Sequence, residues 1–349
     1  MKKRFRKWSI STAAILGAAT VIVSVGSVSI SAAAVHRAFT NHASGCKPPQ
    51  VGRSGKIIDI SGPPNEPFFQ GYKEGADRAA KQLGISYTYS APPNLDNISG
   101  DYPPLITAAI AEHPAALVIG NFIPTAFDPA IKQATCDGIP VVITSVGQGD
   151  WQADGAIAMV GESSTLTGGA AAQAEIKAGA KSGLCVNQEP GAGTLQQRCV
   201  GYLNAFKRAG KPVTEMYIPL ADNTNDQVMI EDMTGELKSH PSIDAMYVQD
   251  SQITPDAVTA EHEVGRHIII GSAGLSNATL QEVKQGSVLC ITDIEIWLQG
   301  YYGVLIAEQY VKYGFVPSAQ VVTGPQLITK SNVASVLSVM GRYQNIRGS

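Results

Sequence analysis

The sequence predicts an α/β protein with two similar Rossmann-like lobes, each built around a parallel sheet. Three observations carry this prediction. Short apolar segments alternate with segments of helical length, a set of landmarks recurs once at a fixed spacing, and roughly 300 residues after the N-terminal segment suit two domains better than one.

Six short apolar runs have the length and composition of buried parallel strands, which are apolar on both faces. Segments of helical length lie between them, for example 69–83, 194–209 and 228–239. Strands that alternate with such helices form βαβ units, and these units build a parallel sheet. The expected strands are 56–60, 116–119, 140–144, 183–187, 243–248 and 267–271.

The chain also contains an internal repeat. In both copies a His-Pro pair lies between a helix and a strand. In both, a glycine also lies on either side of the next expected strand along the chain. A spacing this long is not that of a solenoid repeat, so it predicts two tandem copies of one α/β domain. The landmarks, 126 or 127 residues apart, are Gly75 with Gly201, His113 with His240, Gly138 with Gly265 and Gly147 with Gly274.

Residues 1–34 have the features of a secretory signal sequence. A strongly basic start precedes an uncharged stretch, which is apolar but rich in small residues and ends in a run of alanines. Two alternatives remain: an uncleaved membrane anchor, because the stretch is long enough to span a bilayer, and a lipid on Cys46, because residues 43–46 resemble a lipobox. All three interpretations predict export, and they make residues 35–54 an exported linker.

The composition argues against several classes of protein. A net charge of −3 with 16% charged residues does not favour nucleic acid or an acidic membrane surface as a partner. Six scattered histidines and five cysteines without C-x-x-C spacing provide no metal-ligand cluster, so we expect no metal and no cofactor. The sequence has no G-x-S-x-G motif or other nucleophile with a paired base, so we expect that the protein is not an enzyme.

The residues after the expected strands are the candidates for a site, because ligands of open α/β sheets bind beyond the carboxyl ends of the strands. Segment 62–69 follows the first strand, and Asn121 follows the second. Segment 189–194 follows the fourth strand, with Arg198 about one helical turn later, and segment 249–251 follows the fifth.

Two motifs at these positions resemble the ribose-binding-type periplasmic sugar-binding family, the solute-binding components of carbohydrate ABC transporters. Residues 65–69 (NEPFF), with Gly71 and Gly75, resemble its opening signature, and residues 198–202 (RCVGY) are similar to its second-lobe Arg-x-x-Gly-aromatic motif. The resemblance covers nearly all of the chain after about Gly55. Sugar-responsive repressors share the two lobes but begin with a DNA-binding helix-turn-helix, where this chain has the signal-like segment.

The resemblance implies the type I periplasmic binding protein fold, in which a three-crossover hinge joins the lobes. Each lobe is then discontinuous. We expect residues 55–162 plus 294–321 in lobe 1, residues 163–293 plus 322–345 in lobe 2, and crossovers near Glu162, Asp293 and Val322.

The resemblance also implies roles for single residues. Phe68 and Phe69 match aromatics that pack on the C–H faces of a sugar, and Arg198 matches a cleft arginine that donates hydrogen bonds to sugar oxygens. Asp250 and Asp293 match ligand acceptors, and we expect an acidic neighbour such as Asp250 to hold the guanidinium of Arg198. Each residue also has a plain structural interpretation, as a core aromatic, a surface arginine or a strand-end cap.

The chain departs from the family at other ligand positions. Glu66 replaces a ligand-binding Asn, so we keep it, with Asn121, as a candidate contact. Trp151 or Trp297 would supply a stacking surface that the family takes from other aromatics. The remaining departures argue against ribose itself and leave a small sugar or polyol; they are Val146-Gly147 in place of an Asp-Arg pair, and Thr224 and Ser272 in place of two aromatics.

One cysteine pair has a predicted partner. Cys185 lies early in an expected strand and Cys199 lies inside the helix that returns beside it, so the two can approach, and export favours a disulfide. The alternative is two buried thiols in one core. Cys46, Cys136 and Cys290 have no assignment.

The sequence thus predicts an extracytoplasmic, monomeric solute-binding protein. It would capture a small carbohydrate or polyol between its lobes and deliver it to a membrane ABC permease. A receptor that passes ligand occupancy to a membrane signalling protein has the same sequence features and is the alternative.

Overall fold

The computed structural model describes residues 45–188, 193–219, 222, 225–343 and 346–347. The predicted signal sequence and the first half of the predicted linker, residues 35–44, lie outside these residues. None of the helices in the described part of the chain combines the length and the apolar character needed to cross a bilayer.

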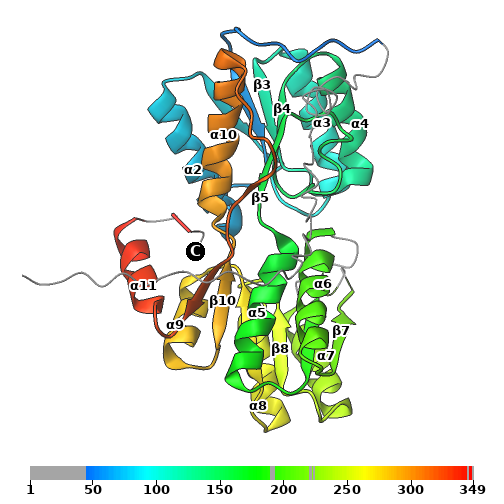
Figure 1. Cartoon of the computed structure of the whole chain (residues 1–349), viewed down its shortest axis with the longest axis vertical. Coiled ribbons are helices and arrows are strands. Elements are labelled where there is room, and N and C mark those ends of the chain that lie inside the picture. Colours follow the sequence, from blue (N-terminus) through cyan, green and yellow to red (C-terminus); the bar gives the residue numbers. More distant parts are fainter. Residues whose placement is uncertain (1–44, 189–192, 220–221, 223–224, 344–345, 348–349) are drawn as a thin grey trace, which may run out of the picture. The chain divides into compact units, whose positions relative to one another are not determined.

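Lobe 1 is built on a sheet with strand order β11-β5-β4-β3-β1-β2, in which the strands pair in parallel. Helices α2 and α10 cover one face of this sheet, and α3 and α4 cover the other (Figure 1). Its elements are β1 (Ile57–Ile60), α2 (Pro67–Leu83), β2 (Tyr87–Ser90), α3 (Ile98–Ala111), β3 (Ala116–Ile119), α4 (Pro124–Cys136), β4 (Val141–Ser145), β5 (Ala158–Gly161), α10 (Ile296–Tyr313) and β11 (Val321–Val322).

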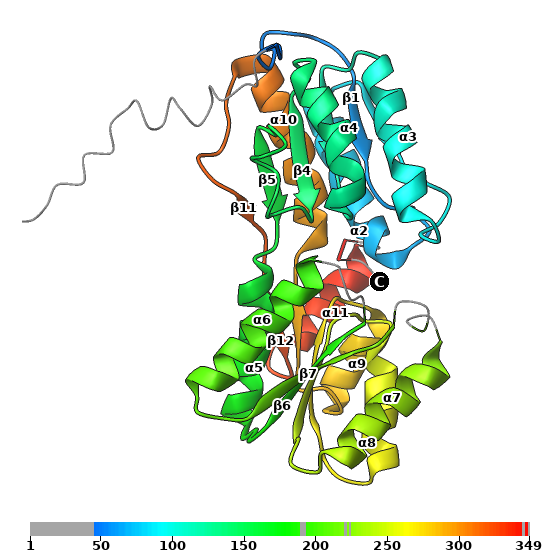
Figure 2. The ribbon, with the colours of Figure 1, turned by 90° about the vertical axis from the view of Figure 1, so that its right-hand side faces the viewer.

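Lobe 2 is built on a second sheet, with strand order β12-β10-β9-β8-β6-β7. Helices α5 and α6 pack on one face, and α7, α8 and α9 pack on the other (Figure 2). Its elements are α5 (Ser164–Ala178), β6 (Gly183–Asn187), α6 (Gly193–Arg208), β7 (Val213–Tyr217), α7 (Asp226–Ser239), β8 (Ala245–Val248), α8 (Thr254–Val264), β9 (Ile269–Ala273), α9 (Asn277–Gln285), β10 (Cys290–Asp293), β12 (Gln326–Thr329) and α11 (Val333–Arg342).

The predicted fold class is confirmed, and all six expected strands form within two residues of their predicted ends. Apolar side chains buried on both faces explain why these central strands were recognisable, as in β3 and β4. One pairing departs from the expectation of purely parallel sheets, because β12 runs antiparallel to β10.

The repeat has a structural counterpart in each lobe. Gly138 and Gly265 both end a helix with a positive φ, of 80° and 67°, and Gly147 and Gly274 both follow a central strand with φ of 105° and 77°. Such left-handed backbone favours glycine. The same turns therefore recur at the same place in both lobes.

Glycines also allow two helix pairs to pack with their backbones in contact. A Cβ on Gly75 of α2 would overlap the carbonyl oxygen of Trp297 in α10, and a Cβ on Gly201 of α6 would overlap that of Thr165 in α5. These pairs, α2 with α10 and α5 with α6, fix the helical layer on one face of each sheet.

The described end of the predicted linker is attached to lobe 1. Cys46 forms a disulfide with Cys136 at the end of α4. The backbone N–H of Gln50 donates to the carbonyl of Gly138, at 3.2 Å between nitrogen and oxygen. Residues 45–52 are therefore part of the folded lobe.

Candidate functional site

The chain passes between the two sheets three times, after β5, after β10 and after β11. The three connections are hydrogen-bonded to one another. The Thr323 N–H donates to the Gly161 carbonyl of the first connection, and its hydroxyl donates to the Ile294 carbonyl of the second, both at 3.0 Å. Gln320 Nε2 donates to the Glu162 carbonyl, also at 3.0 Å. The crossovers therefore form one bonded junction at the strand ends of both lobes.

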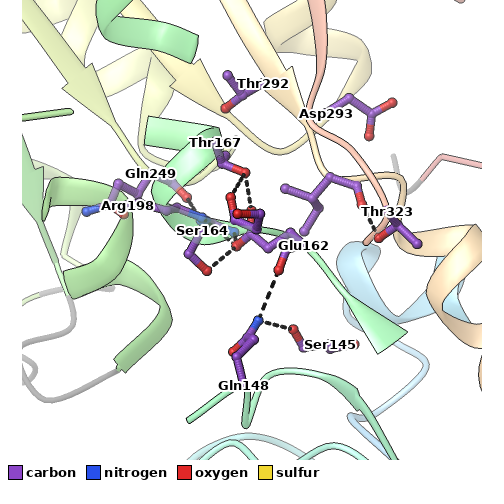
Figure 3. Close-up of polar contacts among 12 residues, drawn as sticks. Ser145, Gln148, Glu162, Ser164, Thr167, Arg198, Gln249, Thr292, Asp293 and Thr323 are labelled. Carbon is purple, nitrogen blue, oxygen red and sulfur yellow. Dashed lines mark hydrogen bonds and ion pairs between the residues drawn. The ribbon is translucent and has the colours of Figure 1, made fainter. Parts of the chain in front are cut away.

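Arg198 and Glu162 form a buried ion pair beside this junction (Figure 3). Arg198 lies in the first turns of α6, and its Nε and Nη2 lie 2.8 and 2.6 Å from Glu162 Oε1. The Glu162 side chain is 1% exposed, and Thr167 Oγ1 donates to its other oxygen at 2.7 Å. Burial lowers the pKa of Arg198, but the charge and hydrogen bond of Glu162, together with the nearby Tyr247 and Asp250, raise it, and the net shift is upward.

A third contact fixes the other end of the guanidinium. Arg198 Nη1 donates to the carbonyl of Gln249, at the end of β8, at 3.1 Å. Arginine has five N–H donors in a fixed planar fork, and these contacts use three of them. The other two, one on each terminal nitrogen, have no hydrogen-bond partner among the described residues.

An acidic residue does hold the guanidinium of Arg198, as expected, but it is not Asp250. The bonded acid is Glu162, and the bonded group at the end of β8 is the Gln249 carbonyl. Asp250 Oδ1 accepts the backbone N–H of Gln252 at 2.8 Å. Burial raises the pKa of Asp250, Arg198 lowers it, and the charge of Glu66 raises it further. Asp250, Arg198 and Glu66 thus share one electrostatic environment.

Asp293 lies at the second crossover, 2% exposed, and a residue near the C-terminus neutralises it. Arg347 Nη1 pairs with Asp293 Oδ2 and donates to Gln326 Oε1 at 2.7 Å. Asp293 Oδ1 accepts the Glu295 N–H. Burial raises the pKa of Asp293 to about 6, and Arg347 opposes that shift.

The aromatic residues predicted to contact a ligand differ in how exposed their rings are. Phe68, at the start of α2, is 36% exposed, whereas Phe69 is 5% exposed and packs edge-on against Phe68 and Phe122. Trp151 is partly buried against the core of lobe 1. Trp297 stacks on the neighbouring Tyr301 of α10. Among these rings, Phe68 is the most accessible at a strand end.

Asn121 is buried beneath the loop that follows β4. Its Nδ2 donates to Asp128 Oδ1 at 3.0 Å and contacts Asp154 Oδ2 at 3.4 Å. A Cβ on Gly147 would crowd its side chain. These contacts join the 147–155 loop to α4. Glu66 is half-buried at the N-cap of α2 and makes no side-chain capping bond.

The predicted Cys185–Cys199 disulfide is confirmed, and Cys46–Cys136 is a second bridge that the sequence did not assign. Cys290 is free and buried. A Cys46 sulfur bonded to Cys136 has no thiol for a lipid, so this structure does not fit the lipoprotein alternative. No cluster of three or more metal-ligating side chains occurs within the described ranges.

Sequence reasoning missed three residues of this site. The sequence predicts a crossover near Glu162 but indicates no role for its side chain, although it is the only charged residue between Asp154 and Glu175. Gln249 contributes through its backbone, which carries no sequence signal. Arg347 lies 54 residues from Asp293, and no local pattern connects the two.

Comparison with known proteins identifies relatives of the whole fold. The profile of the periplasmic binding protein domain family matches residues 60–314. The ribose import binding protein RbsB of Bacillus subtilis is 25% identical over 209 residues, which cover 59% of this chain and 65% of that protein, just under two thirds of its length.

Solved structures agree with the family match. A carbohydrate transporter from Acidothermus cellulolyticus, in complex with myo-inositol, has a TM-score of 0.74 and 27% identity, over 84% of this chain and 100% of that one. A periplasmic ribose ABC transporter structure from Conexibacter woesei has a TM-score of 0.72 at 18% identity, over 86% and 99%, and supports the fold alone. The chain belongs to the periplasmic binding protein domain family.

Proposed function

We propose that this protein is an extracytoplasmic solute-binding protein that captures a small sugar or polyol between its lobes and delivers it to an ABC importer. The proposal rests mainly on how Arg198 is bonded. Arg198 is held by Glu162 and the Gln249 carbonyl at the strand ends of lobe 2, and in the part of the chain that the structure describes two of its N–H donors have no partner.

A fixed arginine suits a neutral, hydroxyl-rich ligand. Its planar fork presents two N–H groups to adjacent hydroxyl oxygens or a ring oxygen, and it loses little freedom on binding because it is already held. The Glu162 carboxylate balances its charge, so the site needs no anionic ligand. This balance favours a sugar or polyol over a phosphate or carboxylate.

We assign three further contacts to the same ligand. The exposed face of Phe68 would pack on C–H groups of a ring. Glu66 and Asp250 would accept hydrogen bonds from hydroxyl groups, because carboxylates accept at several lone pairs. Burial raises the pKa of Asp250, so a hydroxyl group that donates to this carboxylate would help to satisfy it.

The relative bound to myo-inositol supports a cyclic polyol as the first ligand to test, since it is 27% identical over 84% of this chain. Delivery to an importer rests on membership of a family of transport binding proteins. The hydrogen-bonded crossovers supply a junction about which two lobes can close on a ligand.

A thermal-shift screen tests the proposal. The panel contains myo-inositol, other cyclic polyols, pentoses and hexoses, with amino acids and inorganic phosphate as controls. A ligand at 100 times its Kd stabilises the folded protein by about 2.7 kcal/mol, enough for a clear rise in Tm. The proposal fails if no sugar or polyol raises the Tm, or if the control compounds raise it instead.

A further inference from the structure

The Cys185–Cys199 disulfide lies directly against the ion-paired arginine. Cys185 is in the centre of β6, and Cys199 is the residue after Arg198 in α6. Both cysteines are fully buried. The bridge therefore ties the turn of α6 that carries Arg198 to β6, which lies between β8 and the edge strand β7.

Gln249 connects the disulfide to the guanidinium. Its side-chain Nε2 lies 3.2 Å from Cys199 Sγ and 3.8 Å from Cys185 Sγ, and it donates to the Val186 carbonyl at 3.0 Å. Its backbone carbonyl accepts from Arg198 Nη1 at 3.1 Å. One residue thus touches both sulfurs with its side chain and the arginine with its backbone.

Helix α5 packs closely against the same turn. A Cβ on Gly168 of α5 would overlap the carbonyl oxygen of Arg198. Glu162, just before α5, binds the guanidinium. The backbone of Arg198 is therefore in contact with α5 and adjacent to the bridged Cys199, and its side chain is bonded to both Glu162 and Gln249.

We propose that the Cys185–Cys199 disulfide is a positioning element for Arg198, in addition to any contribution to stability. With the bridge absent, α6 can move away from β6 and Gln249 loses the sulfurs against which it packs. The Arg198 donors then lose their fixed direction, and solute affinity falls. The effect on affinity rests on the proposed function, whereas the effect on Arg198 itself does not.

The second disulfide provides a matched control. Cys46–Cys136 spans 90 residues of sequence, against 14 for Cys185–Cys199, and lies in lobe 1. Because bridges over longer loops restrict the unfolded chain more, its removal should cost at least as much stability. A disulfide that acts only on stability predicts the larger loss in Tm for Cys46→Ala/Cys136→Ala and no special effect at Arg198.

The first readout needs no ligand. In ¹⁵N-arginine-labelled exported protein, the buried Nε–H of Arg198 should give a slowly exchanging resonance, assigned by its loss in Arg198→Lys. Loss of about one hydrogen bond corresponds to roughly tenfold faster exchange. We expect that change in Cys185→Ala/Cys199→Ala, and an unchanged resonance in Cys46→Ala/Cys136→Ala. Equal exchange in the two double variants would overturn the proposal.

The second readout is the Kd for myo-inositol and for any panel compound that binds the wild type. At a temperature where both double variants are folded, we expect about tenfold weaker binding without Cys185–Cys199, and unchanged binding without Cys46–Cys136. Wild-type protein that binds none of the panel would contradict the proposed function, while the arginine exchange still decides the positioning role.

A third variant covers the case in which Cys185→Ala/Cys199→Ala does not fold. Gln249→Leu keeps the disulfide and the backbone carbonyl but removes the Nε2 contacts with both sulfurs. We expect Arg198 Nε–H exchange between the wild-type and the disulfide-free rates. Wild-type exchange in folded Gln249→Leu would overturn the proposed link through Gln249.

Discussion

Glu162→Gln is the substitution that most directly perturbs the site. The change preserves the shape of the side chain but removes its charge, and leaves the guanidinium of Arg198 buried without an anion. Arg198 and Glu162 have side chains only 8% and 1% exposed. Removing one partner of a buried ion pair costs about 3–5 kcal/mol, because the remaining charge is uncompensated.

The expected loss is large enough to measure. For domains of 150–250 residues, 1 kcal/mol corresponds to roughly 2–4 °C in Tm, so Glu162→Gln should lower the Tm of the protein by about 6 °C or more. Urea denaturation gives the free energy of unfolding directly from the midpoint and the slope.

A matched control uses the same change on the surface. Glu74 forms an exposed pair with Arg78 at 3.8 Å, and such pairs contribute about 0–1 kcal/mol. Glu74→Gln should therefore leave the unfolding free energy nearly unchanged. In Glu162→Gln/Arg198→Met no buried charge remains, so the double variant should recover part of the loss. Equal, small effects of Glu162→Gln and Glu74→Gln would refute the buried ion pair.

Three further outcomes are expected. Arg347→Ala should cost more stability at pH 7.5 than at pH 5, because Asp293 has a pKa of about 6 and loses its charge, and with it the ion pair, as the pH falls through that value. Urea midpoints at both pH values check this prediction, and equal costs at the two pH values would contradict it. The raised pKa also means that the folded state binds the Asp293 proton more tightly than the unfolded state does. The stabilisation from this protonation is full below about pH 4 and is lost as the pH rises through about 6. Non-reducing mass spectrometry of exported protein should recover a peptide that links Cys46 to Cys136, and free, alkylatable thiols at both would contradict the second bridge. Gly75→Ala should destabilise lobe 1 by about 1–3 kcal/mol, because its Cβ would overlap a backbone carbonyl of α10; a wild-type urea midpoint would refute that close packing.

The sequence predicted the central parts of the fold better than its edges. Strands such as β3 and β8 are fully buried and read as continuous apolar runs. The edge strands β2 and β7 are only partly buried and mix polar with apolar residues, so they gave no such run. The antiparallel β12 pairs with β10 only after the third crossover, a contact that no local pattern specifies.

The site was predictable where a motif carried it. Arg198 was located by the residues around it, and the structure places it at the strand ends of lobe 2. Its partner Glu162 lies 36 residues earlier, on the first crossover, and meets it only through the packing of α5 on α6. The contact at the end of β8 comes from the Gln249 backbone and not from the Asp250 side chain, because Asp250 turns to cap its own loop.

Calorimetric titration of the wild type and an Arg198→Lys variant tests most directly the claim that Arg198 binds a sugar or polyol. Lysine keeps the charge beside Glu162, so folding is preserved, but a single ammonium cannot reproduce the two directed donors of the fork. We predict that a cyclic polyol or monosaccharide of the panel, myo-inositol first, binds wild-type protein with one site per chain, and that Arg198→Lys weakens this binding by about tenfold or more. Wild-type affinity in folded Arg198→Lys, or no heat of binding from any sugar or polyol, would contradict the claim.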